Sequence, residues 1–179
     1  MTLRKDVYSN RLAAARERLS FIGADGLFAT PSSNLFYLTG IDFHRSERLT
    51  AVFLFKDRDP FVVCPAFEEA RLRGMSAVDE IHTWEETEDP FGKAAALFPP
   101  RTGTLGVEPS TAYDDVERLI SARPGWKAVS AAPLLGPMRM VKTPEEIAAI
   151  RRAIEVAASR FRKAFGALKP GAVEAEISH

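Results

Sequence analysis

Apolar side chains recur at helical spacing near the start of the chain, between Asn10 and Ile22. Arginines and a glutamate occupy most of the remaining positions, which is the pattern of an amphipathic helix. Gly23 follows and ends the predicted helix. Residues 25–29 have the composition of a short strand that stops before Pro31, because proline interrupts a β-ladder. A helix followed directly by a strand indicates a layered α/β structure.

Two runs rich in Val and Phe, residues 51–55 and 61–64, are separated by a polar segment with the composition of a hairpin loop. We expect these runs to pair as antiparallel strands. Helical and strand patterns alternate beyond them, as helix 66–75, strand 80–82, helix 90–98, strand 104–107, a helix capped by Ser110 or Thr111, and strand 126–129. The pattern predicts an α/β fold, with a mixed β-sheet flanked by helices, over residues 1–133.

Two prolines and a glycine then follow in quick succession, so we expect an interdomain linker over residues 134–142. Thr143 and Glu146 have the spacing of a capping box, with Pro144 at the first helical position. The helix that follows carries one apolar stripe, formed by Ile147, Ile150, Ile154, Ala157, Phe161, Ala164, Phe165 and Leu168. Residues 143–179 are too few for a domain with its own core, which needs roughly fifty residues. They must pack on the first domain or belong to a larger unit.

Composition narrows the classes of function. The chain has 24 Lys and Arg against 24 Asp and Glu, so no net field attracts nucleic acid or anionic membranes. The first twenty residues hold no apolar stretch long enough for a signal sequence or a membrane span. Cys64 is the only cysteine, which excludes an internal disulfide and a Cys-rich zinc site. We therefore expect a cytoplasmic protein, with Cys64 buried as a small apolar residue.

The usual catalytic motifs are missing from the sequence. There is no phosphate-binding Gly-rich loop with Lys, no His-Glu-x-x-His, no Cys-x-x-Cys and no Gly-x-Ser-x-Gly. The three histidines, His44, His82 and His179, are scattered, whereas hydrolytic metal sites need several converging ligands. We expect no catalytic residue and no metal or other cofactor within this chain. His82 is interpreted as a structural or surface residue, and Trp84 as a packing residue.

One polar loop, residues 42–48, remains a candidate for binding. It connects a predicted tight turn at Tyr37–Gly40 to a buried strand, so the scaffold anchors it at both ends. His44, Arg45 and Arg48 are candidates for contacting the substrate, because guanidinium groups bind a carboxylate in bidentate fashion. The alternative is a solvated loop whose arginines pair with Glu47 or Asp42 and contribute little.

The segment Asn34-Leu35-Phe36-Tyr37-Leu38-Thr39-Gly40 resembles the Asn-x-x-Tyr-Leu-Thr-Gly segment of the N-terminal domain of creatinases, prolidases and Xaa-Pro aminopeptidases. Two further segments strengthen the resemblance. Residues 105–108 are similar to a strand of that domain, and residues 138–147 are similar to the family's entry into its catalytic domain. The three segments occur in the family's order and cover nearly the whole chain.

The resemblance implies a two-domain enzyme that hydrolyses bonds next to proline in short peptides. Its second domain has the pita-bread fold and binds two divalent ions (Mn, Co or Zn) through two Asp, one His and two Glu. None of these ligands can be assigned to residues of this chain, so residues 143–179 are expected to be the truncated start of that domain. The family also implies a homodimer, in which the N-terminal domain packs on the neighbouring subunit and narrows access to the active site.

Three alternatives stay open. The parent protein could be a creatinase-like hydrolase of small amides, since this part of the sequence contains too little of a pocket to decide. It could be a catalytically silent module that binds peptide or protein, as in the peptidase-like domain of histone chaperones. A free-standing small-ligand domain explains least, because it leaves the apolar stripe of residues 143–168 uncovered.

Overall fold

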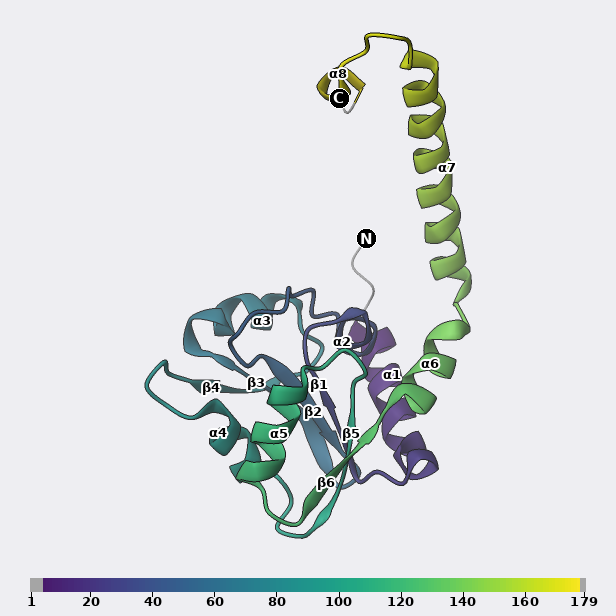
Figure 1. The fold of residues 1–179 in the computed structure, drawn as a ribbon. Helices are drawn as coiled ribbons and strands as arrows, with labels where there is room; N and C mark the ends of the chain where they lie inside the picture. The colour runs from purple at the N-terminus through teal and green to yellow at the C-terminus, as the bar shows by residue number, and fades with distance from the viewer. Residues whose placement is uncertain (1–4, 178–179) are drawn as a thin grey trace. The chain divides into compact units, whose positions relative to one another are not determined.

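The structure is a computed structural model that describes residues 5–177, and it divides into two compact units, Met1–Arg139 and Met140–His179. The first unit contains one six-stranded sheet in the order β4-β3-β2-β1-β5-β6 (Figure 1). The strands are β1 (Gly26–Ala29), β2 (Ala51–Phe55), β3 (Arg58–Pro65), β4 (Glu80–Trp84), β5 (Gly103–Val107) and β6 (Trp126–Ser130). The predicted α/β class with a mixed sheet and flanking helices is confirmed.

The directions of the strands bring most of their carboxyl ends to the same edge of the sheet. β2 runs antiparallel to both of its neighbours, whereas β1, β3, β4, β5 and β6 all point the same way. The predicted hairpin of β2 and β3 is confirmed, although its turn is shorter than expected and consists of Lys56 and Asp57. The carboxyl ends of five strands therefore meet the amino end of β2, at an edge called here the carboxyl edge, formed by Ala29, Ala51, Pro65, Trp84, Val107 and Ser130.

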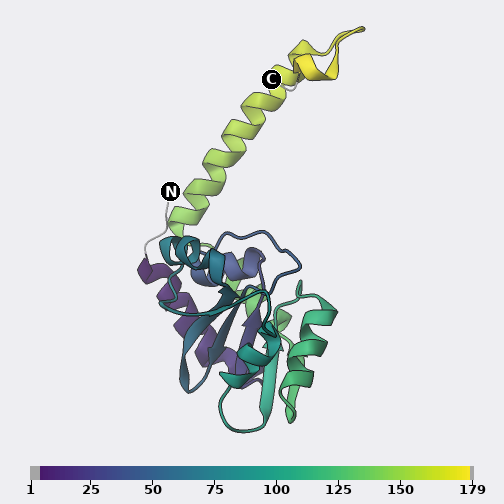
Figure 2. The same ribbon diagram turned by 90° about the vertical axis from the view of Figure 1, so that its left-hand side faces the viewer.

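Helices cover both faces of the sheet, as the two views in Figures 1 and 2 show. One face carries α1 (Lys5–Arg18), the 3-10 turn η1 (Leu19–Ile22), α2 (Ser33–Thr39), α3 (Glu69–Met75) and α6 (Ala132–Met140). The other face carries α4 (Pro90–Ala96) and α5 (Tyr113–Ala122). A second 3-10 turn, η2 (Ala66–Glu68), connects β3 to α3.

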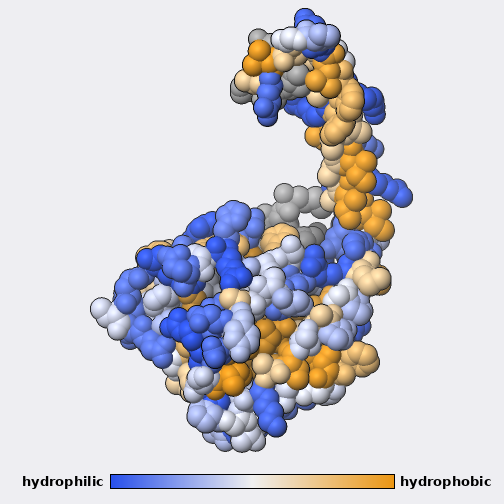
Figure 3. Space-filling view, in the orientation of Figure 1, coloured by the Kyte–Doolittle hydropathy of each residue, from blue (hydrophilic) through white to orange (hydrophobic). Residues whose placement is uncertain are grey.

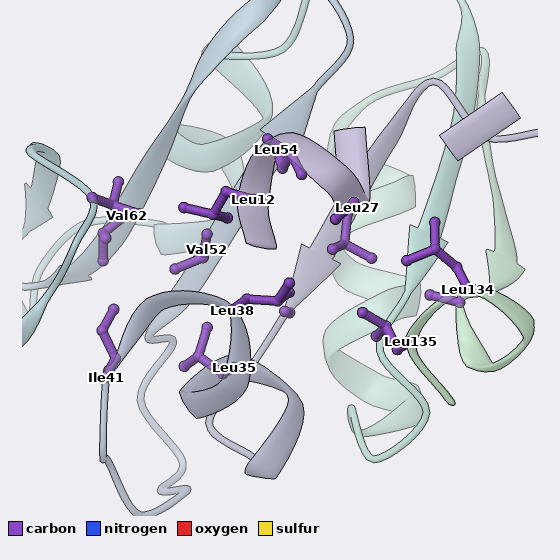
Figure 4. Packing of buried hydrophobic residues seen from close by; sticks show 14 of the residues in the cluster. Leu12, Leu27, Leu35, Leu38, Ile41, Val52, Leu54, Val62, Leu134 and Leu135 are labelled. Atoms are coloured by element: carbon purple, nitrogen blue, oxygen red, sulfur yellow. The ribbon is translucent and has the colours of Figure 1, made fainter. Parts of the chain in front are cut away.

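Each face has its own core because successive residues of a strand point to opposite sides. In β1, Leu27 joins the core under α1, while Phe28 joins an aromatic core under α4 and α5. Figure 4 shows the first core, where leucines of α1, α2 and α6 meet those of the strands. The Phe28 and Phe53 rings of the second core stack at 5.1 Å between centroids. Full burial of each large side chain contributes about 1.5–3 kcal/mol.

Two local expectations in the first unit are wrong. Residues 33–39 form helix α2 instead of a tight turn, with Ser32 accepting from the Leu35 amide at 3.1 Å and Gly40 ending the helix at φ 79°. The cap of α5 is Ala112, which makes no capping hydrogen bond through its side chain. The hydroxyls expected there are used elsewhere, because Ser110 donates to Glu108 and Thr111 pairs with Thr30.

The expected linker over residues 134–142 is mostly helical. Residues 132–140 form α6, whose Leu134, Leu135 and Met138 are buried in the core of the first unit. Burial of these apolar side chains outweighs Pro137, which lies inside the helix. The division between the compact units accordingly falls between Arg139 and Met140.

The second unit consists of α7 (Pro144–Ala167) and the short α8 (Glu174–Ile177). The capping box at Thr143 and Glu146 is confirmed, with 3.2 Å and 2.9 Å for its two hydrogen bonds. No residue of α7 is buried, and its apolar stripe is visible in Figure 3 as orange side chains along the helix. Exposure of the large stripe residues ranges from 41% at Ile147 to 66% at Phe161. Among the described helices, none combines the length and the apolar character needed to cross a membrane.

Candidate functional site

The loop of residues 42–48 lies at the carboxyl edge, because it follows α2 and precedes the amino end of β2. The segments that follow β1, β3, β4 and β5 begin at the same edge. In open α/β sheets, ligands bind preferentially beside the carboxyl ends of strands. The three residues predicted from the sequence, His44, Arg45 and Arg48, are all exposed here.

Arg48 is held by two carboxylates. Its Nε donates to Oε1 of Glu86 at 2.7 Å, and its Nη1 donates to Oε1 of Glu47. The hydrogen bond to Glu86, together with the charges of Glu86 and Glu47, raises the pKa of Arg48. Glu86 follows β4, so this pair fastens the loop to a neighbouring segment of the carboxyl edge.

Arg45 contacts the segment that follows β5. Its Nη1 donates to the backbone oxygen of Ser110 at 3.1 Å. Partial burial raises the pKa of Asp115 in α5, and the positive charge of Arg45 opposes that rise. Among the residues that the structure describes, Arg45 is therefore oriented by a single hydrogen bond and retains other donors for a ligand.

Two hollows flank the loop and share Phe43 and His44 as a common wall. The first, called the α2 hollow, has a volume of about 320 Å³ and is also lined by Ser32, Phe36 and Arg45. The second, called the α3 hollow, has a volume of about 260 Å³ and is also lined by Arg48, Phe67 and Arg71. The structure thus places His44 beside both hollows, but it separates Arg45 from Arg48.

A buried carboxylate fixes the elements around the α2 hollow. Glu108, 1% exposed, accepts from Nδ2 of Asn34 at 2.5 Å and from the amide and hydroxyl of Ser110 at 3.0 and 2.6 Å. Oδ1 of Asn34 accepts in turn from Arg139 at 2.7 Å. These contacts tie the start of α2 to the end of β5 and to α6. Asn34 and Glu108 stand in two of the sequence segments that carry the family resemblance, although nothing in the sequence indicated that they touch.

The described residues include no group of three or more His, Cys, Asp or Glu side chains placed to hold a metal ion. His82 contacts Oε1 of Glu80 at 2.6 Å at the sheet margin. Cys64 is fully buried, as predicted, and burial together with nearby Glu69 and Glu68 raises the pKa of its thiol to about 12. His179 lies outside the described residues. The carboxyl edge offers cations and aromatic rings, which suit recognition of an anionic group.

Sequence reasoning missed Phe67 and Arg71. They belong to η2 and α3, about twenty positions beyond the candidate loop, and only the fold brings them to the α3 hollow. The guanidinium of Arg71 lies 4.3 Å from the ring centroid of Phe43. No pattern in the sequence signals this contact.

Comparison with known proteins places these features in context. Residues 11–141 match the model of the Creatinase/Prolidase N-terminal domain. The chain is similar to the putative dipeptidase YkvY of Bacillus subtilis, with 30% identity over 94% of this chain and 47% of that protein. It is also similar to the probable dipeptidase PepE of Mycobacterium tuberculosis, with 32% identity over 97% of this chain and 47% of that protein.

The fold is shared with a solved structure. Dipeptidase PepE from Mycobacterium ulcerans superposes with a TM-score of 0.87 at 30% identity, covering 99% of this chain and 48% of that one. The chain therefore spans about half the length of the relatives that it matches.

Proposed function

Because the chain belongs to the Creatinase/Prolidase N-terminal domain family, we propose that it serves as the non-catalytic N-terminal domain of a metal-dependent dipeptidase. One observation carries the proposal. Nearly the whole chain aligns with proteins named as dipeptidases, yet it spans about half of their length. The substrate class that we propose is a short peptide of the Xaa-Pro type.

Hydrolysis itself is assigned to a second domain. The described residues do not fit a two-metal centre, because they include no cluster of three possible ligands. Two divalent ions (Mn, Co or Zn) would be held by that second domain, where they would activate water for attack on the peptide bond. Residues 143–179 are proposed to begin the catalytic domain, with α7 as its first helix.

The proposed role of the first unit is dimerisation and control of access to the active site. In a homodimer, the loop of residues 42–48 would face the active site of the partner subunit. Arg45 is the best placed of the predicted residues to donate hydrogen bonds to the substrate, since among residues 5–177 it makes one hydrogen bond. Arg48 would position the loop through Glu86 instead of contacting the substrate. The cytoplasm is the proposed location.

The names of the relatives favour a peptide substrate over the small amides that creatinases cleave. They also favour an enzyme over a silent binding module. Both alternatives predict no cleavage of Xaa-Pro dipeptides by the whole protein, so an activity assay separates them from the proposal.

The gating role is tested in the protein translated from the whole reading frame. Arg45→Ala and His44→Ala should each raise KM for an Xaa-Pro dipeptide at least about tenfold, because one charge-assisted hydrogen bond contributes roughly 1.5–3 kcal/mol. Metal content should not change. Arg18→Ala, at an exposed arginine of α1, is the control and should leave KM unaltered.

The activity of mixed dimers tests whether the loop acts on the active site of the partner subunit. Mixing Arg45→Ala subunits with subunits disabled at a metal ligand should restore activity in heterodimers if the loop acts on the partner's site. Unchanged kinetics in both single variants would mean that the loop is ordinary surface.

A further inference from the structure

Of the three arginines Arg45, Arg48 and Arg71 at the carboxyl edge, Arg71 makes the fewest hydrogen bonds to the described residues. Within residues 5–177 it makes no hydrogen bond, and its one ion pair, to Oε2 of Glu68, spans 3.9 Å. Arg48 is held by Glu86 and Glu47, and Arg45 donates to Ser110. The guanidinium of Arg71 therefore retains its full set of donors for a ligand.

The orientation of Arg71 is nevertheless restricted. Its guanidinium lies over the ring of Phe43, 4.3 Å from the centroid, within the range of a cation–π contact. Phe43 is partly buried and packs against the core under α1. Stacking reduces the entropy that a long side chain loses when it binds a ligand, so the free donors are partly preorganised.

The α3 hollow provides an apolar surface beside these donors. Phe67, 65% exposed, and the buried Pro65 line the hollow together with Arg71. Its volume of about 260 Å³ lies below the range of ~300–1,000 Å³ that is usual for whole small-molecule sites. A hollow of this size accommodates one end of a ligand, and a cation beside an aromatic face suits a carboxylate attached to an apolar residue.

From this geometry we propose that Arg71 and Phe67 form a subsite for the C-terminal residue of a short peptide. Arg71 receives the terminal carboxylate in bidentate fashion, and the apolar side chain of that residue packs on Phe67. Glu68 lines the same hollow, and its negative charge disfavours a multiply charged anion such as phosphate. The assignment of the ligand as a peptide rests on the proposed dipeptidase function, whereas the carboxylate preference rests on the hollow itself.

Binding to the 179-residue chain tests the subsite without requiring catalysis. The probes are the dipeptide Gly-Pro, its C-terminal amide Gly-Pro-NH2, and inorganic phosphate, each titrated while the NMR signals of the arginine Nε–H groups are followed. Gly-Pro should shift the Arg71 signal and should bind at least about fivefold more tightly than the amide, since only the acid offers a carboxylate. Phosphate should bind more weakly than Gly-Pro.

Two arginines of α3 provide a matched pair of variants. Arg71→Met removes the charge but keeps an apolar stem, and it should weaken Gly-Pro binding at least about fivefold. Arg73→Met is the control, because Arg73 hydrogen-bonds Glu69 at 3.0 and 2.7 Å and does not line the hollow. Phe67→Ala should weaken Gly-Pro more than it weakens acetate, which has no side chain to pack on the ring.

Equal binding of Gly-Pro and its amide, or unchanged binding by Arg71→Met, would overturn the subsite. Phosphate binding as tight as Gly-Pro would reduce it to a general anion site and would equally contradict the proposal. A separate outcome would contradict the proposed dipeptidase function. If the whole protein cleaves no Xaa-Pro dipeptide but Gly-Pro still binds through Arg71, the dipeptidase function is wrong and the subsite is supported. If cleavage occurs with unaltered binding and KM in Arg71→Met, only the subsite is wrong.

Discussion

At the scale of single residues, Glu108 illustrates what sequence patterns leave out. It is 1% exposed, and a buried carboxylate is tolerated only when hydrogen bonds replace its lost water. Asn34 and Ser110 supply these bonds, but Asn34 is 74 positions away. Cys64, by contrast, is predicted correctly as buried because its neighbours in the sequence are apolar. Local composition predicts burial, whereas polar partners depend on the fold.

Glu108→Gln is expected to lower the free energy of unfolding by about 1–3 kcal/mol. The new amide nitrogen must face a donor from Asn34 or Ser110, so at least one buried polar group loses its partner. Urea denaturation followed by circular dichroism measures the change. Glu117→Gln, on the exposed face of α5, is the control and should stay within about 0.5 kcal/mol of the unsubstituted chain. Equal stability of the two variants would show that the buried network contributes little.

At the scale of helices and strands, strong apolar periodicity predicts an element more reliably than single glycines and prolines predict a turn or a linker. The strands and the long helix α7 are found where apolar patterns and the capping box predict them. Helix α2 is missed because Gly40, which ends it, is taken for part of a tight turn. Helix α6 is missed because its prolines and glycine suggest a linker, while its buried leucines contact residues distant in sequence.

Gly40→Ala tests the end of α2. Gly40 has φ 79°, and an added Cβ would lie 2.8 Å from the Tyr8 ring and 3.2 Å from the Met75 backbone oxygen. We expect a loss of about 2 kcal/mol or more in unfolding free energy, because strain and overpacking add. Thermal unfolding provides the measurement.

Gly74→Ala is the matched control for that substitution. Gly74 lies in α3, its φ is not positive, and nothing lies within 4 Å of an added Cβ. Alanine should therefore stabilise α3 by about 0.5–1 kcal/mol. A Gly40→Ala variant as stable as Gly74→Ala would mean that the left-handed cap is not required.

At the scale of the whole molecule, the apolar stripe of α7 is the feature least consistent with an isolated chain. The sequence predicts a stripe that needs a cover, and no residue of α7 is buried. Each exposed apolar side chain forgoes about 1.5–3 kcal/mol of burial. The catalytic domain proposed above would supply the cover, and without it another copy of the chain is the available partner.

We therefore expect the 179-residue chain to self-associate through α7 in light scattering. The double variant Ile154→Lys with Phe161→Lys should reduce this association, since both side chains are more than 60% exposed. Phe21→Lys is the control, because it removes an even more exposed aromatic ring from the first unit. A monomeric chain whose α7 amides exchange freely would contradict the prediction that the stripe requires a cover.

In the proposed division of roles, this chain recognises and positions the substrate, while a second domain carries the metal-dependent chemistry. The most direct test of this division is hydrolysis of an Xaa-Pro dipeptide in the presence of Mn²⁺, measured for the 179-residue chain and for the protein translated from the whole reading frame. We expect turnover by the whole protein that a chelator abolishes, and none by the 179-residue chain, whose described residues hold no cluster of metal ligands. Chelator-sensitive turnover by the 179-residue chain, absent from a mock purification, would contradict this division of roles.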